Sequence, residues 1–198
     1  QEPEWRSARV GICFARLDGA TLFAHEAHKL FIPASNTKLF TSALALRRLG
    51  ADFRFRTELR HEGELDAAGV LQGNLVLIGG GDPSLRRADL RTLAEVAQRA
   101  GLRQVMGGIV ADSSRVTDGP YGFGWEIDDL PYYYLPEVRA LSVDRNAVTL
   151  LVTPSMTAGE PALVTVDPPT DYLRIENRVR VTASGARSVE FQRIAHEH

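Results

Sequence analysis

The stretch that decides the fold is FIPASNTKLFTSALALRRLG, residues 31–50. Within it Ser35 stands three residues before Lys38, and apolar residues then recur at helical spacing up to Gly50, a typical helix end. We therefore expect a helix over residues 35–49. Side chains three positions apart share one face of a helix, so this spacing brings a hydroxyl and an amine together.

A serine and a lysine at this spacing are typical of an activated nucleophile. A serine hydroxyl attacks weakly by itself, and a neighbouring amine accepts its proton only where burial or a nearby cation keeps the amine neutral. The ordinary alternative is a helix-capping serine beside a solvated lysine. The composition favours the nucleophile, because only Lys29 and Lys38 are lysines among 23 lysines and arginines. An arginine could not act as the base, since its guanidinium stays protonated.

Three further segments accompany the Ser-x-x-Lys element: GGGDPSL at 79–85, GWEIDD at 124–129 and ALSV at 140–143. Together with PASNTK at 33–38 they resemble the D-alanyl-D-alanine carboxypeptidase/endopeptidase family of low-molecular-mass penicillin-binding proteins. In that family a large domain is inserted into the catalytic domain after the Ser-x-x-Lys helix. The resemblance extends over nearly the whole chain.

The resemblance implies an α+β fold in two parts. Residues 1–58 would start a catalytic domain like that of penicillin-binding proteins and serine β-lactamases, and residues 59–198 would form an inserted, mostly β domain that is incomplete. The residues themselves predict a hairpin of strands at 9–17 and 21–25 and a second helix at 89–100. Short strands are expected elsewhere, at residues 56–59, 74–78, 104–106, 147–152, 162–166 and 188–191.

The same resemblance implies a serine peptidase that acts on peptidoglycan stem peptides. Ser35 would attack the carbonyl of a D-Ala-D-Ala or cross-link peptide bond, Lys38 would accept its proton, and water would hydrolyse the acyl-enzyme. β-Lactam antibiotics would be trapped by the same serine. An aspartate of the inserted domain reaches the cleft in this family, and Asp129 is the closest match as a substrate-binding residue. No cofactor and no metal are implied, because serine acyl transfer requires none.

The sequence also departs from the family. Its members complete the active site with Ser-x-Asn and Lys-Thr-Gly, and neither element occurs in these 198 residues. We therefore expect the N-terminal part of a longer enzyme, inactive alone, with the remaining C-terminal part as its partner. Two alternatives stay open: a non-catalytic cell-wall binding or scaffolding module of the same fold, and a serine esterase or β-lactamase on the same plan.

Composition narrows the class of protein. The chain is 44% hydrophobic with a net charge of −2, and its charges are interspersed rather than gathered in the basic stripe that nucleic acids need. No apolar run approaches the roughly 18 residues of a membrane-spanning helix. The polar N-terminus is compatible with an exported, periplasmic or extracellular protein after removal of a signal peptide. The single cysteine, Cys13, excludes an internal disulfide and is expected to be buried.

Overall fold

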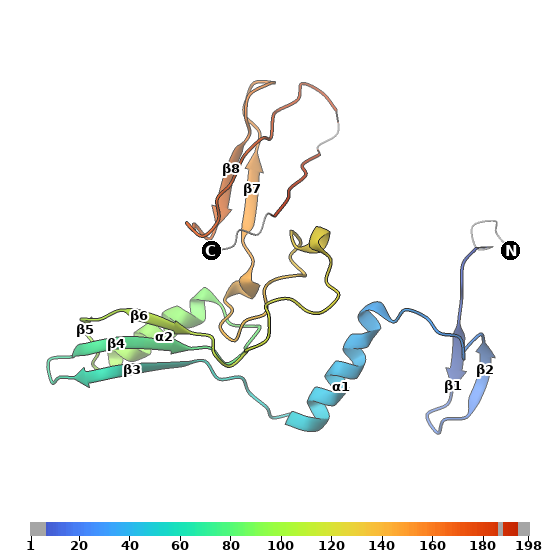
Figure 1. Cartoon of the computed structure of the whole chain (residues 1–198), viewed down its shortest axis with the longest axis horizontal. Helices are drawn as coiled ribbons and strands as arrows, with labels where there is room; N and C mark the ends of the chain where they lie inside the picture. The colour runs from blue at the N-terminus through green and yellow to red at the C-terminus, as the bar shows by residue number, and fades with distance from the viewer. Residues whose placement is uncertain (1–6, 186–187, 194–198) are drawn as a thin grey trace. The chain divides into compact units, whose positions relative to one another are not determined.

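The computed structural model describes residues 7–185 and 188–193 (Figure 1). The chain forms two compact units, of which the first ends at Phe53 and the second begins at Arg54. Both helices and strands are present, so the predicted α+β character is confirmed.

A two-stranded hairpin opens the first unit. Strands β1 (Ile12–Ala15) and β2 (Thr21–His25) pair antiparallel, with an irregularity in register near the turn. The carboxylate of Asp18 accepts the Ala20 N–H at 3.0 Å, and Gly19 takes φ +89°, a value that favours glycine. The predicted hairpin is confirmed.

The helix of the first unit begins slightly later than its pattern predicts. A 3₁₀ turn, η2 (Ala34–Asn36), precedes helix α1 (Thr37–Leu49), and Gly50 follows with φ +83°. No residue of α1 is buried within this unit. Cys13 is exposed as well, so the expected burial of its thiol is wrong for the described residues. The apolar pattern that suggested burial marks a surface of β1 and α1 that the first unit itself does not cover.

The second unit contains a four-stranded sheet. Strands β3 (Glu58–Leu65) and β4 (Val70–Ile78) form a long antiparallel hairpin, and β4 also pairs in parallel with β5 (Gln104–Val105) and β6 (Ile109–Asp112). Leu71 of β4 is fully buried. The sheet is more extensive than predicted, because β6 and most of β3 were not expected.

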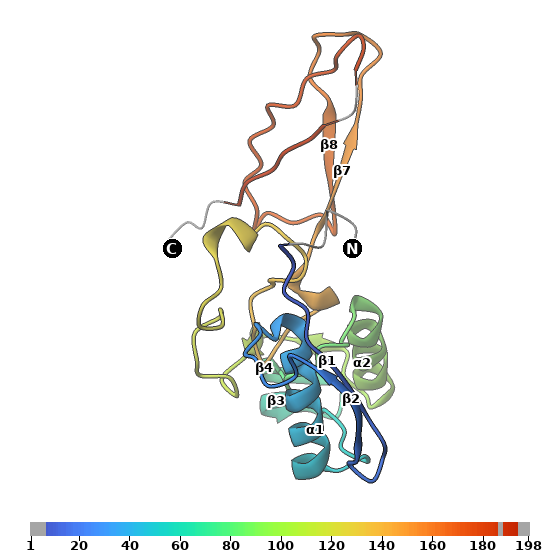
Figure 2. The ribbon, with the colours of Figure 1, turned by 90° about the vertical axis from the view of Figure 1, so that its right-hand side faces the viewer.

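Helix α2 (Arg87–Arg99) lies along one face of this sheet (Figure 2). The predicted helix is confirmed, although it begins two residues earlier than expected. Its apolar side chains, with those of β3 and β4, line a groove of about 270 Å³. The lining includes Leu59, Leu71, Leu75, Leu93, Val96 and Ala97.

The last strands form a separate ribbon. Strand β7 (Thr149–Thr153) pairs antiparallel with β8 (Leu163–Asp167), and the Ala162 N–H donates to the Val179 carbonyl at 3.0 Å. The prediction of a strand at residues 188–191 is wrong, because this described segment pairs with no other strand. Alternating apolar residues are not enough, since a strand needs a neighbour's N–H and C=O groups.

The three glycines after β4 allow close backbone packing. A Cβ at Gly79 would lie 2.4 Å from the carbonyl carbon and oxygen of Ala140, and one at Gly80 would lie 2.0 Å from the Arg56 carbonyl oxygen. Gly81 has φ +76° and donates its N–H to the Ala140 carbonyl at 2.7 Å. Residues without a Cβ are therefore required where three backbone segments meet.

Candidate active site

The first unit brings Ser35 and Lys38 into direct contact. The Lys38 Nζ lies 3.0 Å from the Ser35 Oγ, a normal hydrogen-bond distance. Ser35 belongs to the turn η2 and Lys38 to the first turn of α1, so local helical geometry alone fixes the pair. The predicted proximity of the Ser35 hydroxyl and the Lys38 amine is therefore confirmed.

The backbone in front of Ser35 is in an uncommon conformation. Ala34 has φ +43°, whereas Pro33 keeps φ −72°. A positive φ is unfavourable for a residue with a Cβ and costs of the order of 1–3 kcal/mol. Such residues are found disproportionately at functional sites, where the bend turns a side chain toward its target. The bend at Ala34 directs the chain into the turn that carries Ser35.

Both members of the pair are exposed within the first unit. A lysine acts as a base only in surroundings that disfavour its charged form, either through loss of hydration or through a neighbouring cation. The described residues of the first unit do not bury this amine. The geometry needed for proton transfer is therefore present, whereas the enclosure that would activate the amine is not supplied by this unit.

Asp129 lies in the second unit, in the short turn η3 (Ile127–Asp129). Its carboxylate accepts a hydrogen bond from the Tyr134 hydroxyl at 3.1 Å. Reduced hydration raises the pKa of Tyr134, and the hydrogen bond to Asp129 and its charge raise it further. Asp129 belongs to the second unit and the Ser35–Lys38 pair to the first, so a shared site of the three residues stays a prediction.

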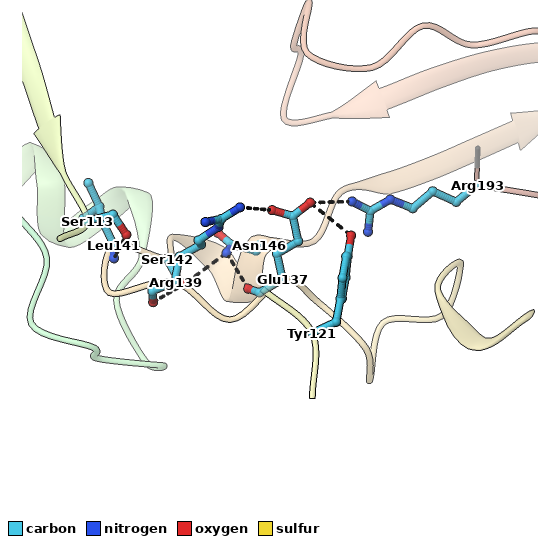
Figure 3. A network of polar contacts seen from close by, with 8 residues as sticks. All are labelled: Ser113, Tyr121, Glu137, Arg139, Leu141, Ser142, Asn146 and Arg193. Atoms are coloured by element: carbon cyan, nitrogen blue, oxygen red, sulfur yellow. Dashed lines mark hydrogen bonds and ion pairs between the residues drawn. The ribbon is translucent and has the colours of Figure 1, made fainter. Parts of the chain in front are cut away.

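Sequence reasoning missed a polar network in the second unit that centres on Glu137. The carboxylate of Glu137 contacts the Tyr121 hydroxyl and the guanidinium groups of Arg139 and Arg193 (Figure 3). Arg193 lies 56 positions away in sequence. No local sequence pattern predicts the contact between Glu137 and Arg193, so it can be recognised only from the fold.

Residues 7–185 and 188–193 contain neither a cluster of metal ligands nor a membrane-spanning helix. No cluster of three or more histidine, cysteine, aspartate or glutamate side chains in this part of the chain could hold a metal ion. None of the helices described there is long and apolar enough to cross a membrane.

Comparison with known proteins identifies the relatives of this chain. Residues 1–198 match the family described as D-Ala-D-Ala carboxypeptidase 3 (S13). A D-alanyl-D-alanine carboxypeptidase of Actinomadura sp. strain R39 is 35% identical over 174 residues, which cover 85% of this chain and 32% of that protein. The D-alanyl-D-alanine carboxypeptidase DacB of Haemophilus influenzae is 30% identical over 135 residues, or 68% of this chain and 28% of the relative.

Solved structures agree with these relatives. The crystal structure of penicillin-binding protein 4 (dacB) from H. influenzae matches with a TM-score of 0.68 and 28% identity, over 75% of this chain and 33% of that one. A second structure of that protein, in complex with a β-lactam, matches with a TM-score of 0.56 and 25% identity, over 75% of this chain and 30% of that one. The chain thus spans about a third of the length of its relatives. The resemblance and fold class predicted from the sequence are confirmed, and the chain belongs to the D-Ala-D-Ala carboxypeptidase 3 (S13) family.

Proposed function

We propose that this chain carries the nucleophile of a serine D-Ala-D-Ala carboxypeptidase/endopeptidase that acts on peptidoglycan stem peptides. The observation that carries the proposal is the 3.0 Å contact between the Lys38 amine and the Ser35 hydroxyl. Membership of the family supports a peptidase role for this pair, because the names of the family and of the relatives specify D-Ala-D-Ala carboxypeptidases. We assign Ser35 as the nucleophile and Lys38 as its base.

The proposed reaction proceeds through an acyl-enzyme. The Ser35 oxygen attacks the carbonyl carbon of the scissile bond, and its proton passes to the Lys38 amine. The tetrahedral oxyanion needs preorganised donors, and we assign the Ser35 backbone N–H as one of them. Collapse of the intermediate breaks the C–N bond, and the departing D-alanine amine takes up a proton. Water then hydrolyses the ester and restores the serine.

The rest of the site is proposed to come from sequence outside these 198 residues. Ser-x-Asn and Lys-Thr-Gly are absent, and the relatives are about three times as long as the matched region. In this proposal residues 1–58 begin the catalytic domain and residues 59–198 belong to the inserted, mostly β domain. The remaining part of the enzyme would cover the exposed pair and complete the oxyanion site. The 198 residues alone are therefore expected to be inactive.

Asp129 is the proposed substrate-binding residue of the inserted domain. A carboxylate in that role suits a cationic or N–H donor of the stem peptide. Its hydrogen bond from Tyr134 holds one carboxylate oxygen and leaves further acceptor positions for a ligand. Asp129→Asn should therefore weaken binding of a Lys-D-Ala-D-Ala peptide to the complete enzyme, whereas Asp128→Asn, in the adjacent position, is the control and should not.

β-Lactams are proposed inhibitors, and the cell envelope is the proposed location. A β-lactam complex is known for the H. influenzae relative, and a lactam that acylates Ser35 would occupy the same position as the peptide. Because peptidoglycan lies outside the cytoplasmic membrane, a protein that acts on it must be exported.

Acylation by a labelled penicillin tests the proposal. In the complete enzyme, intact-protein mass spectrometry should show one covalent adduct, lost in Ser35→Ala. Lys38→Arg keeps a positive charge but removes the base, so acylation should slow about 10²–10⁴-fold. Lys29→Arg is the matched control, because Lys29 is the other lysine and pairs with Glu26 at 2.5 Å.

The same experiment separates the alternatives. Unchanged labelling of Ser35→Ala would place the nucleophile elsewhere and refute the proposal. A complete enzyme that is neither acylated nor active on a Lys-D-Ala-D-Ala peptide would favour the non-catalytic module. Hydrolysis of β-lactams or esters without release of D-alanine would favour the esterase or β-lactamase.

A further inference from the structure

Residues 120–138 form a loop whose two ends are fastened together. The Val138 N–H donates to the Pro120 carbonyl at 2.8 Å, and the Tyr121 hydroxyl donates to the Glu137 Oε1 at 3.2 Å. Loops that a folded scaffold holds at their base carry a disproportionate share of binding residues. We call residues 120–138 the aromatic loop, after its tryptophan and tyrosines.

One carboxylate closes the base of the aromatic loop (Figure 3). The Glu137 Oε1 also accepts a hydrogen bond from Arg193 Nη2 at 3.0 Å, and the Oε2 lies 3.4 Å from Arg139 Nη2. The side chains of Glu137 and Arg193 are only 23% and 31% exposed. Charge-assisted hydrogen bonds in such partly shielded positions are stronger than fully exposed ion pairs.

The backbone of Glu137 is held as well as its side chain. Its carbonyl accepts the Asn146 Nδ2–H at 2.9 Å, and the same amide donates to the Ser142 Oγ at 2.9 Å. Asn146 ends a turn of three consecutive residues with positive φ. Glu137 therefore connects the aromatic loop to two other segments. Its backbone carbonyl binds Asn146 of the positive-φ turn, and its carboxylate binds Arg193.

The loop contains two groups of side-chain contacts, one at its base and one around Asp129. The ring of Trp125 lies 6.2 Å from the ring of Tyr121, whose hydroxyl is bound to Glu137. On the far side, Tyr134 donates to Asp129 and stacks on Tyr132 at 5.3 Å. Asp129 is thus held by contacts inside a loop whose two ends are joined at Glu137.

We propose that Glu137 is a positioning residue for substrate recognition, which fixes the base of the aromatic loop so that Asp129 is presented to the stem peptide in a preformed arrangement. This inference rests on the proposed function of Asp129. In this role Glu137 acts without touching the substrate. It acts by keeping the binding-competent conformation populated, because an observed affinity falls in proportion to the fraction of molecules in that conformation.

The kinetic consequence is selective. Opening the loop weakens an interaction that is made equally in the ground state and the transition state, so KM rises while kcat stays the same. The effect should be confined to ligands that reach Asp129. A Lys-D-Ala-D-Ala peptide offers an ammonium group to that carboxylate, whereas the same peptide with its amine acetylated does not.

The test compares variants of the complete enzyme. In Glu137→Ala we expect KM for the Lys-D-Ala-D-Ala peptide to rise roughly tenfold, the equivalent of one charge-assisted hydrogen bond. KM for the acetylated peptide and the rate of acylation of Ser35 by penicillin should stay at the parental values. Glu137→Gln, which keeps an acceptor for Tyr121, should restore part of the affinity. Glu176→Gln is the matched control, because Glu176 makes an exposed ion pair with Arg178.

Limited chymotrypsin digestion measures the loop directly. Tyr133 is 75% exposed, and its cleavage should accelerate in Glu137→Ala but not in the control. Arg193→Ala provides a second variant that leaves the carboxylate in place and should show the same two effects in milder form.

Three outcomes would overturn the inference. Faster cleavage with an unchanged KM would show that closure of the loop is irrelevant to binding. An equal rise in KM for both peptides, or a parallel fall in kcat and penicillin acylation, would show a general structural role. If neither variant changes cleavage, Glu137 does not hold the loop. Failure of the parental enzyme to be acylated at Ser35 would refute the proposed function instead.

Discussion

Adding one methyl group at Gly79 should destabilise the second unit. The new Cβ would lie 2.4 Å from the carbonyl carbon and oxygen of Ala140, where ordinary contact begins near 3.4 Å. The segment at Ala140 would have to move by about 1 Å, which weakens two hydrogen bonds: Gly81 N–H to the Ala140 carbonyl and Leu141 N–H to the Ser113 Oγ. Overpacking costs about 1–3 kcal/mol and each of the two hydrogen bonds about 1 kcal/mol, so we expect a loss of about 3–5 kcal/mol in Gly79→Ala.

Urea unfolding followed by far-ultraviolet circular dichroism measures this loss, because strands β3 to β8 all belong to the second unit. Gly119→Ala is the matched control: its Cβ would meet nothing within 4 Å and its backbone does not require a positive φ. The urea midpoint should fall in Gly79→Ala alone, with an unchanged slope. A free energy of unfolding within about 0.5 kcal/mol of that of Gly119→Ala would refute the close-packing argument.

Three further predictions concern the second unit. Leu71→Ala removes a fully buried side chain from β4 and should lower the free energy of unfolding by about 2–5 kcal/mol in the same urea assay; a smaller loss than about 1 kcal/mol would contradict its place in the core. Partial burial raises the pKa of Tyr121 above 10.0, and the neighbouring Glu137 raises it further against the opposing charge of Arg193. The folded state therefore holds this proton more tightly, so the contribution of Tyr121 to stability is complete below pH 10 and is lost as the pH rises through the folded-state pKa. The difference in ultraviolet absorbance between parent and Tyr121→Phe should titrate above pH 10, and a midpoint below it would count against the burial. Glu176→Gln breaks an exposed ion pair and should change stability by less than about 0.5 kcal/mol, whereas a larger change would show that the pair is coupled to other groups.

Local patterns predicted the parts of the structure that local geometry determines. The spacing of Ser35 and Lys38 fixed their contact because one helical turn joins them. The hairpin at Gly19 and helix α2 were likewise found from turn and periodicity signals. These elements depend on residues within a few positions of one another.

Non-local pairing accounts for the elements that were missed. Most of β3 was overlooked because Gly63 interrupts a charged segment, yet Gly63 pairs with Gly73 where a Cβ on either residue would strike the opposite strand. The four-residue strand β6 exists only because β4 offers it a parallel partner. Exposure of Cys13 shows the converse: an apolar pattern predicts a face to be covered but does not say which segment covers it.

The same difference between local and non-local contacts applies to the candidate site. Ser35 and Lys38 could be named from the sequence, whereas Glu137 could not, because its partner Arg193 is 56 positions away. A motif records residues that chemistry requires at fixed spacing. The residues that hold a loop in place are free to come from anywhere in the chain.

The packing of Trp125 beside Tyr121 gives the aromatic loop an optical signal of its own. The chain has two tryptophans, Trp5 and Trp125, and the second is 38% exposed. In a Trp5→Phe background of the 198-residue chain, all indole emission would originate in this loop. Its wavelength and its quenching by iodide would then report opening of the loop continuously, in unlabelled protein and without any turnover of substrate.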